Sequence, residues 1–503
     1  MRKIAFAAAG VLLSVGLLSP TQALAIDQVN TEKLLKAVTV NGILQHERAF
    51  QRIANDNDGT RASGTPGYDA SADYVVKKLR KAGYKVKRQT FTFPFFRELE
   101  PAELSVTSPN SRDIVTATFT YSGSGQIMGP VVPTNDIVIQ PGAEPSSTSG
   151  CEATDFPAAP SGPAIALIQR GTCTFQVKVE NAAAAGYDAV IIFNEGQAGR
   201  TELLPGTLGE PQSIPAVGIS FADGRTLYEE TQDGTVTARV STSTENDPDR
   251  ETVNVIADSP RGKINGQTIV IGAHLDSVTA GPGINDNGSG SATILEIAEQ
   301  LAALKYTNKL QRQVRFAFWG AEELGLFGSE HYVDSLSEAQ LDKIYANLNF
   351  DMVGSPNYVR FVYDGNGDSD DDAPAGPPGS DTIEEIFTKY FADQGLASEP
   401  TAFDGRSDYG PFIAAGIPAG GLFSGAEGLK TAQQAAVYGG TAGVAYDECY
   451  HQACDTISNL NSKALSELGD AAAHATLTLA LSETGLFPDG SRVAQVKVTG
   501  KAA

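Results

Sequence analysis

The sequence predicts an α/β protein: a doubly wound, mostly parallel sheet with helices on both faces, into which a smaller β-rich domain is inserted. Two observations lead to this prediction. From about residue 253 onward, short apolar runs typical of buried strands alternate with segments of helical spacing, as in parallel sheets. Between about residues 98 and 247, short β-like runs lie among Gly, Pro, Ser and Thr instead, which indicates a separate unit.

The first part of the chain is expected to form helices followed by a strand. Apolar residues after Pro66 recur at helical spacing, and Lys85 to Phe93 then has the composition of a strand. A chain of 503 residues is too long for one ordinary core, so at least two domains are expected. We place the main domain at 26–97 and 248–486, the insert at 98–247 and a C-terminal tail at 487–503.

The later elements follow from the same patterns. In the insert, a helix at 177–185 separates predicted strands at 164–168 and 189–193. The main domain is predicted to contain strands at 268–273, 314–319 and 345–350, and helices at 289–304, after Glu323, near Thr382 and near Leu465. This alternation of strand and helix favours right-handed crossovers and a mostly parallel sheet.

The first 25 residues have the organisation of a secretory signal peptide. Arg2 and Lys3 precede an apolar run at 4–18, and Ala23-Leu-Ala25 is a small-x-small cleavage site. The apolar run is shorter than the roughly 20 residues that span a membrane, which argues against an anchor. We therefore expect cleavage after Ala25, secretion to the extracellular space and no membrane association afterwards.

The chain is strongly acidic. Its formal net charge is −23, and it becomes −25 when the signal peptide takes Arg2 and Lys3 away. Such a surface repels nucleic acid and anionic membranes, so neither is expected as a partner. Most of the carboxylates are expected to be solvated surface groups.

Four cysteines in an exported chain indicate disulfide bonds. Three connectivities are possible, and the spacing favours the local pairs Cys449–Cys454 and Cys151–Cys173. The first pair would brace a loop that contains His451. A cysteine-rich zinc site is the alternative, but the spacings fit none of the usual ligand patterns.

Five fragments rich in imidazoles and carboxylates lie far apart in the sequence, several of them directly after predicted strands. The chain has only five histidines, and two of them lie in these fragments. Because ligands of such sheets bind outside the carboxyl ends of the strands, the fragments are expected to converge into a two-metal hydrolase site. They are His274-Leu-Asp276, Asn285-Asp286-Asn287, Glu322-Glu323, Asn349-Phe-Asp351 and Tyr450-His451.

Each fragment has a plainer interpretation when it is taken alone. A His-x-Asp fragment is common in surface turns, and an acidic pair stabilises a helix start by about 0.3–1 kcal/mol. The glycine-rich loop 283–290 could bind phosphate, but it lacks the Walker lysine and the dinucleotide spacing. The Asp286 carboxylate would also repel phosphate. The coincidence of five fragments favours the metal site.

Neighbouring residues in the fragments are expected to divide the work. Glu322 and Glu323 point in different directions, so one can bind metal while the other accepts the proton of the attacking water. His274 is the natural metal ligand, and Asp276 would orient its imidazole from behind.

These fragments, in this order, resemble the M28 zinc aminopeptidases, most closely the secreted bacterial leucine-type enzymes. The resemblance extends to three further stretches, and the insert resembles a protease-associated (PA) domain through two more. The first three are Thr65-Pro-Gly-Tyr68, Asp404-Gly-Arg-Ser-Asp408-Tyr and Gly439-Gly-Thr-Ala-Gly443. The insert stretches are Arg170-Gly-Thr-Cys-Thr-Phe175 and the run from Glu180 to Asn194.

The resemblance implies two Zn²⁺ ions per chain and a role for each residue of the site. One ion would be held by His274, Asp286 and Asp351, and the other by Asp286, Glu323 and His451. Glu322 would be the general base, and Asp276 would support His274. Tyr450 would stabilise the oxyanion, and Arg406 would contact the bound ligand. The bond between Asp286 and Asn287 would be cis.

The predicted function is that of a secreted, monomeric aminopeptidase that acts on the N-termini of peptides and proteins and prefers leucine and other large apolar residues. One alternative is another metallo-exopeptidase or amidase on the same fold, such as a carboxypeptidase. It would need a basic cluster, for which Arg406 is the one candidate identified. The other is a non-catalytic PA-type binding protein, which should have lost metal ligands.

Overall fold

The protein is described from a computed structural model that covers residues 26–487 apart from 141, 265 and 370–373. The predicted signal peptide, and the predicted tail beyond Phe487, lie outside these residues. Within the described ranges, no helix combines the length and the apolar character that crossing a membrane requires.

The secondary structure follows the predicted order closely. The helices are α1 Glu32–Leu35, α2 Val40–Asn55, α3 Pro66–Lys81, α4 Phe175–Ala184, α5 Phe221–Asp233, α6 Gly290–Ala303, α7 Phe327–Asp334, α8 Glu338–Leu341, α9 Ser380–Asp393, α10 Gly410–Ala414, α11 Ala432–Tyr438 and α12 Ser462–Leu481. The strands are β1 Lys85–Ser108, β2 Arg112–Ile114, β3 Ala117–Thr118, β4 Gly125–Pro133, β5 Ile165–Gln169, β6 Ala189–Phe193, β7 Ala216–Ile219, β8 Thr237–Asp258, β9 Thr268–His274, β10 Gln313–Trp319, β11 Ile344–Phe350, β12 Phe361–Tyr363, β13 Glu399–Thr401 and β14 Ala419–Phe423.

The sheet of the main part is mixed and mostly parallel. Its strand order is β13-β12-β14-β11-β9-β10-β8. The central strands β14, β11, β9 and β10 are parallel, whereas β8 and β12 run antiparallel to their neighbours β10 and β14. The predicted fold class is confirmed.

Alternation along β9 shows how one strand serves two cores. Ile269 and Ile271 pack into the large core beneath α2, α3, α6, α9 and α12. Val270 points the other way, into a second core with Tyr332 of α7 and Phe412 of α10. Successive side chains of a strand alternate between faces, so a strand that is apolar at every position is buried on both sides. Helices therefore cover both faces of the sheet.

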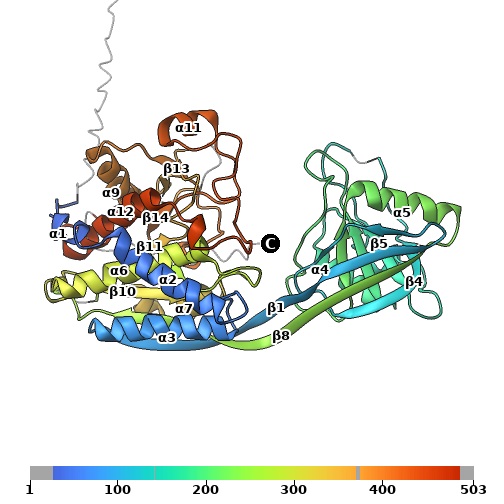
Figure 1. Ribbon diagram of the computed structural model, residues 1–503, viewed down its shortest axis with the longest axis horizontal. Coiled ribbons are helices and arrows are strands. Elements are labelled where there is room, and N and C mark those ends of the chain that lie inside the picture. Colours follow the sequence, from blue (N-terminus) through green and yellow to red (C-terminus); the bar gives the residue numbers. More distant parts are fainter. Residues whose placement is uncertain (1–25, 141, 265, 370–373, 488–503) are drawn as a thin grey trace, which may run out of the picture.

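A long two-stranded ribbon connects the main part to the insert. Strands β1 and β8 pair antiparallel from Lys85 opposite Asp258 to Ser108 opposite Thr237, and they cross between the two bodies in Figure 1. The register shifts where β1 carries Pro94 and again near Pro101, because proline cannot donate to the ladder. The insert therefore shares strands with the main part, and the expected boundaries at 98 and 247 fall within this ribbon.

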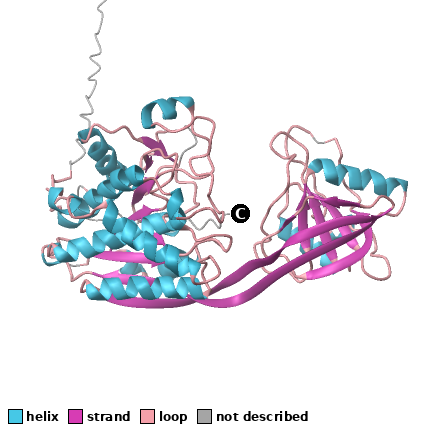
Figure 2. Cartoon of the chain, in the orientation of Figure 1, coloured by secondary structure: helices cyan, strands magenta, loops and turns pink. Residues whose placement is uncertain are grey.

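The insert is rich in strands, with β4, β5, β6 and β7 parallel and β3 antiparallel at the edge. Figure 2 shows that most helices belong to the main part. Both expected disulfides form: Cys151–Cys173 lies in the insert, and Cys449–Cys454 lies in the loop between α11 and α12.

Candidate active site

Parallel strands bring most of the predicted fragments to one edge of the sheet. His274 is the last residue of β9, and Asp351 directly follows β11. Glu322 and Glu323 follow β10 after a short turn in which Ala321 has a positive φ of 55°. Because β11, β9 and β10 are parallel neighbours, their carboxyl ends lie side by side, as the sequence predicts. His451 reaches the same place from the loop before α12.

The loop that carries Asp286 is held from behind. Residues Ile284–Ser289 form an irregular helical turn, and the bond between Asp286 and Asn287 is cis, as the family resemblance implies. The carboxylate of Asp455 accepts the main-chain N–H groups of Asn285 at 2.9 Å and of Asp286 at 3.0 Å. The Asn287 side chain accepts the N–H of Gly290 at 2.8 Å.

The Asp286 carboxylate lies between the two imidazoles. Its Oδ1 is 3.2 Å from His274 Nε2, and its Oδ2 is 3.2 Å from His451 Nε2. On the His274 side, Asp351 Oδ1 is 3.3 Å from Nε2. On the His451 side, Glu323 Oε2 is 3.0 Å from Nε2. The structure thus forms two donor groups that share Asp286.

Glu322 and Asp276 lie beside these groups. Glu322 Oε2 is 3.9 Å from His274 Nε2, and Asp276 Oδ1 is 3.6 Å from His274 Nδ1 on the other edge of the ring. Two sets of three side chains could each hold a metal ion, because the donor atoms within each set lie within 4.8 Å of one another. They are His274 with Asp286 and Glu323, and His274 with Glu322 and Asp351.

The pKa values of the cluster reflect the burial of several carboxylates close together. Burial raises the pKa of the Glu323 carboxyl to about 7 and raises that of Glu322 well above its usual range. Burial opposes a charged His451, but the carboxylates of Glu323 and Asp286 outweigh it and raise the pKa of His451 to about 10. The protein alone offsets these carboxylates with protons, and a bound cation could take their place.

The donor set fits zinc. Zn²⁺ is bound by imidazole nitrogens and carboxylate oxygens, and catalytic sites use about three such protein ligands per ion. Glu323 Oε1 is buried and has no hydrogen-bond partner within the described structure. A buried carboxylate oxygen without a partner is costly, and a metal ion would satisfy it.

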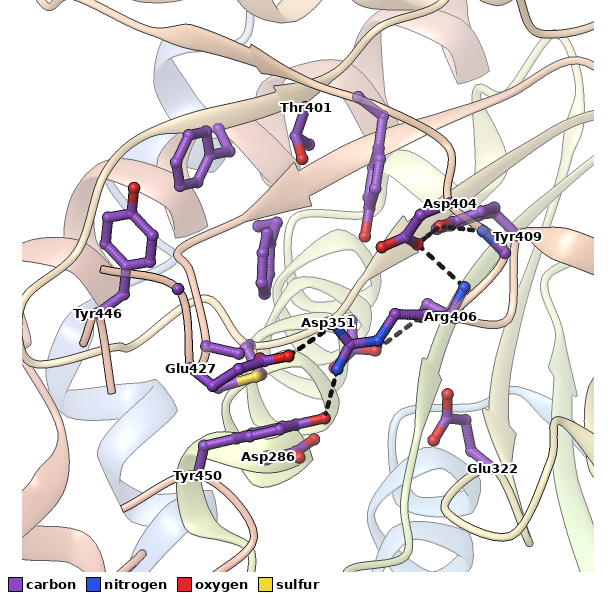
Figure 3. Close-up of a pocket in the computed structure, with 18 of the residues that line it drawn as sticks. Asp286, Glu322, Asp351, Thr401, Asp404, Arg406, Tyr409, Glu427, Tyr446 and Tyr450 are labelled. Carbon is purple, nitrogen blue, oxygen red and sulfur yellow. Dashed lines mark hydrogen bonds and ion pairs between the residues drawn. The ribbon is translucent and has the colours of Figure 1, made fainter. Parts of the chain in front are cut away.

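Tyr450 and Arg406 lie at the mouth of the site. The Tyr450 ring stacks on His451 with the ring centroids 3.8 Å apart, and the Cys449–Cys454 disulfide encloses both residues. Arg406 Nη2 donates to the Tyr450 hydroxyl at 3.2 Å, while its Nη1 is 2.8 Å from Glu427 Oε1 (Figure 3). The structure therefore brings every predicted catalytic, metal and substrate residue into one neighbourhood.

A cavity of about 580 Å³ opens onto these residues. One side is formed by the charged groups of the cluster, and Tyr446 lies across the cavity from Glu322 (Figure 3). Aromatic and apolar residues also line the cavity, which can therefore accept a large side chain. They include Met352, Phe361, Tyr363, Phe423 and Tyr446.

Two residues of the site were missed by the sequence reasoning. Asp455 holds the Asp286 loop, as described above. Ser407 donates to Asp351 Oδ2 at 2.6 Å and accepts from Asn349 Nδ2 at 2.8 Å, which fixes the orientation of the Asp351 carboxylate. Ser407 lies inside the stretch from Asp404 to Asp408, which the resemblance singled out, and Asp455 directly follows the disulfide. Their positions in these two stretches are the sequence features that could have indicated a role in the site.

The fold and the site define a metallohydrolase: imidazoles and carboxylates converge at the carboxyl edge of an α/β sheet, beside a cavity that can hold a substrate. Comparison with known families agrees. The family model described as Peptidase family M28 matches residues 254–476, and that of the PA domain matches residues 127–227.

Curated relatives narrow the class further. The chain is 48% identical to an aminopeptidase of Pseudomonas aeruginosa over 89% of this chain and 82% of the relative. It is 40% identical to leucine aminopeptidase 2 of Arthroderma otae over 92% of this chain and 88% of that protein. The chain therefore belongs to peptidase family M28 and is a metallo-aminopeptidase with an inserted PA domain, which confirms the predicted resemblance.

Solved structures show the same architecture. The aminopeptidase from Aneurinibacillus sp. strain AM-1 has a TM-score of 0.68 at 25% identity, covering 93% of this chain and 98% of its own. BSAP, a zinc aminopeptidase from Bacillus subtilis, has a TM-score of 0.60 at 26% identity, covering 87% of this chain and 94% of its own.

Proposed function

We propose that the protein is a secreted di-zinc aminopeptidase that removes leucine and other large apolar residues from the N-termini of peptides. One observation carries the two-ion proposal: the two oxygens of Asp286 are each 3.2 Å from a different imidazole. A carboxylate in this position would serve as a ligand in both halves of a two-metal site.

In this proposal, His274, Asp286 and Asp351 hold one ion, and Asp286, Glu323 and His451 hold the other. Zinc bound there supplies Lewis-acid polarisation of a water molecule and of the substrate carbonyl. Asp276 keeps the His274 ring oriented through Nδ1. The similarity to BSAP, whose title names zinc, supports the choice of metal.

The remaining residues divide the proton transfers. Glu322 is the general base: its carboxylate accepts the proton of the attacking water and then delivers it to the amine of the leaving peptide. The Tyr450 hydroxyl donates a hydrogen bond to the oxygen that gains negative charge. Arg406, which already contacts that hydroxyl, contacts the bound substrate beside it.

The preference for a free N-terminus follows from charge. Carboxylates line one side of the cavity, and they favour a substrate ammonium or amine over an uncharged acyl group. N-acetyl-leucyl anilide should therefore remain uncut when leucyl anilide is cleaved. Efficient hydrolysis of the acetylated substrate would refute the exopeptidase assignment.

The preference for leucine is supported by the aromatic and apolar residues that line the cavity and by the leucine aminopeptidases among the relatives. Burying a leucine side chain there contributes about 1.5–3 kcal/mol. The rate with leucyl anilide should therefore exceed that with glycyl or aspartyl anilide. Equal values of kcat/KM for the three would overturn this part of the proposal.

Secretion is supported by the signal-like segment and by the two disulfides, because disulfides persist in oxidising compartments. Export predicts that the protein recovered from the culture medium begins at Ile26. We also propose that the mature protein is a monomer, and that residues 26–97 and 248–486 form the peptidase domain around the insert at 98–247.

The experiment that tests the proposed function is metal removal and reconstitution. The purified protein should contain about two zinc ions per chain, lose leucyl-anilide hydrolysis on chelation and regain it with added zinc. A carboxypeptidase would instead cleave N-blocked peptides with a free C-terminus. A non-catalytic binding protein would show no zinc-dependent hydrolysis.

A further inference from the structure

We propose that Arg61 is a positioning residue for the zinc site, because its guanidinium fixes the segment that carries His274 against the loop that carries Asp286. This inference rests on the proposed function, since it concerns the affinity of that site for zinc. Arg61 lies in the loop between α2 and α3, far from the metal fragments in the sequence.

The Arg61 side chain is fully buried, with 0% of its surface exposed. Burying a guanidinium is costly unless its N–H groups find acceptors. Nε donates to the carbonyl of Pro282 at 2.8 Å, Nη2 to that of Gly283 at 2.5 Å, and Nη1 to that of Leu275. All three acceptors are main-chain carbonyls of one segment that loops away from β9.

These acceptors lie at both ends of that segment. Leu275 stands between His274 and Asp276, directly after β9, whereas Gly283 lies three residues before Asp286. A rigid planar group that bonds both ends at once fixes the distance between them. The separation of the His274 imidazole and the Asp286 carboxylate therefore depends on Arg61.

Neighbours of Arg61 in the chain extend the same support. The Thr60 hydroxyl donates to the carbonyl of Val278 at 2.9 Å, and the main-chain N–H of Arg61 donates to Ser277 Oγ at 3.0 Å. Ser63 Oγ accepts the N–H of Ala321 at 2.6 Å, directly before Glu322. Residues 60–63 thus contact the segments that carry His274, Asp286 and Glu322.

A second buried ionisable residue lies near Arg61. Glu47 of α2 is also 0% exposed. A Cβ on Gly288 would lie 2.8 Å from Glu47 Oε2 and 3.6 Å from Arg61 Nη2, so both side chains lie close to Gly288 in the Asp286 loop. Burial lowers the pKa of Arg61, and among nearby acids Glu47 opposes this most strongly. Glycine at position 288 leaves room for both.

The test compares zinc affinity in Arg61→Lys and in a matched control, Arg312→Lys. Arg312 is also buried, at 2% exposed, and it also donates to main-chain carbonyls, those of Leu479 and Ser482. Its partners lie at the end of α12, outside the site. Both variants should lose thermal stability, because lysine cannot reproduce the planar set of donors.

Competition with a zinc chelator gives the dissociation constant, and Tm gives the loss of stability. We expect Arg61→Lys to weaken zinc binding by about 10- to 100-fold, as substitutions behind metal ligands commonly do, with activity restored by excess zinc. Arg312→Lys should bind zinc as the unchanged protein does. Equal zinc affinity of the two variants at comparable Tm would overturn the inference.

A milder variant covers the case in which Arg61→Lys does not fold. Ser277→Ala removes the acceptor of the Arg61 N–H together with the donation of this hydroxyl to the carbonyl of Gly281, and it should weaken zinc binding roughly two- to tenfold, about the worth of a neutral hydrogen bond. Unchanged zinc affinity in this variant would count against the inference. If the unchanged protein itself bound no zinc, the proposed function would fail instead, so the two failures are distinguishable.

Discussion

Asp455 accepts the main-chain N–H of Asp286 at 3.0 Å, so one buried carboxylate holds the backbone of the residue whose own carboxylate lies between the two imidazoles. The same group accepts the N–H of Asn285 at 2.9 Å. Both oxygens accept from donors, Oδ1 from Asn285 N–H and Asn459 Nδ2 and Oδ2 from the N–H groups of Asn285 and Asp286, so an NH₂ group in place of either oxygen would face a donor.

Asp455→Asn is therefore expected to weaken zinc binding. Its amide offers one acceptor oxygen and one NH₂ group, which would face a main-chain N–H. We expect zinc affinity to fall by about 10- to 100-fold, measured by chelator competition. The control is Asp393→Asn, an exposed residue of α9 paired with Lys389, which should change nothing. Unaltered zinc binding in Asp455→Asn would contradict the supporting role of Asp455.

Glu322 and Glu323 allow a comparison between adjacent residues. Glu322→Gln removes the general base, so kcat should fall by about 10²- to 10⁴-fold while the zinc content stays near two. Glu323→Gln removes a proposed ligand and should instead lower the zinc content of the dialysed protein. If Glu322→Gln turned over substrate normally, the assignment of the base would be wrong.

The two disulfides can be removed separately. Cys449→Ser/Cys454→Ser frees the loop that carries Tyr450 and His451, so kcat/KM and zinc retention should fall. The loop closed by this bridge is short, with a sequence separation of 5, and the loss of stability should be correspondingly modest. Cys151→Ser/Cys173→Ser in the insert is the matched control and should leave leucyl-anilide cleavage intact.

His474 predicts a pH dependence of stability that is independent of the active site. Burial lowers the pKa of His474 to about 4. Its ring stacks on Tyr390, with the ring centroids 4.7 Å apart. The unfolded chain takes up this proton near pH 6.5 and the folded protein only near pH 4. The free energy of unfolding is therefore not reduced by His474 above pH 6.5, and it falls as the pH drops towards 4.

The measurement for His474 is the free energy of unfolding at about pH 7.5 and about pH 5. Over this interval the group should account for about 2 kcal/mol. His474→Phe keeps a ring against Tyr390 but cannot titrate, so it should lose less stability on acidification than the unchanged protein. Zinc-free samples remove the contribution of the metal site, and parallel losses in both proteins would refute the prediction.

The insert can be removed at a defined point of the ribbon. Arg97 pairs with Glu245 across β1 and β8, with a side-chain contact of 2.7 Å. Replacing 98–244 by Asn-Gly would close a tight hairpin there. The described residues that line the cavity all lie between Asp286 and His451, so dipeptides should still be cleaved. If the insert restricts access, its removal should raise the kcat/KM for longer peptides relative to that for dipeptides. An unchanged ratio of the two values would exclude gating by the insert.

The strands that could be predicted from the sequence are those with a continuous apolar run. Strands β9, β10 and β11 are buried on both faces, so their apolar runs were readable from the sequence. Strand β14 was not, because its Ala-Gly-Gly-Leu-Phe sequence resembles a turn. A Cβ on Gly421 would lie 1.8 Å from the Asn349 carbonyl oxygen, so the strand needs glycine for close approach, contrary to the general preference.

The site was predictable as a set of fragments but not in its supports. Metal-type residues after strand ends are a recognisable pattern. Arg61 and Asp455 lie in loops and Glu47 lies within helix α2. Exposure is the default expectation for these residue types, and only the three-dimensional structure shows them buried. Prolines at 94 and 101 likewise conceal that β1 is continuous, which placed the expected domain boundary within a strand.

The contact between Asp286 and Asp455 spans 169 residues of sequence, and this has a consequence for biosynthesis. A nascent chain on the ribosome cannot complete the Asp286 loop, nor place His451 opposite it, until residue 455 has been synthesised and has left the exit tunnel. Every shorter intermediate lacks a working centre.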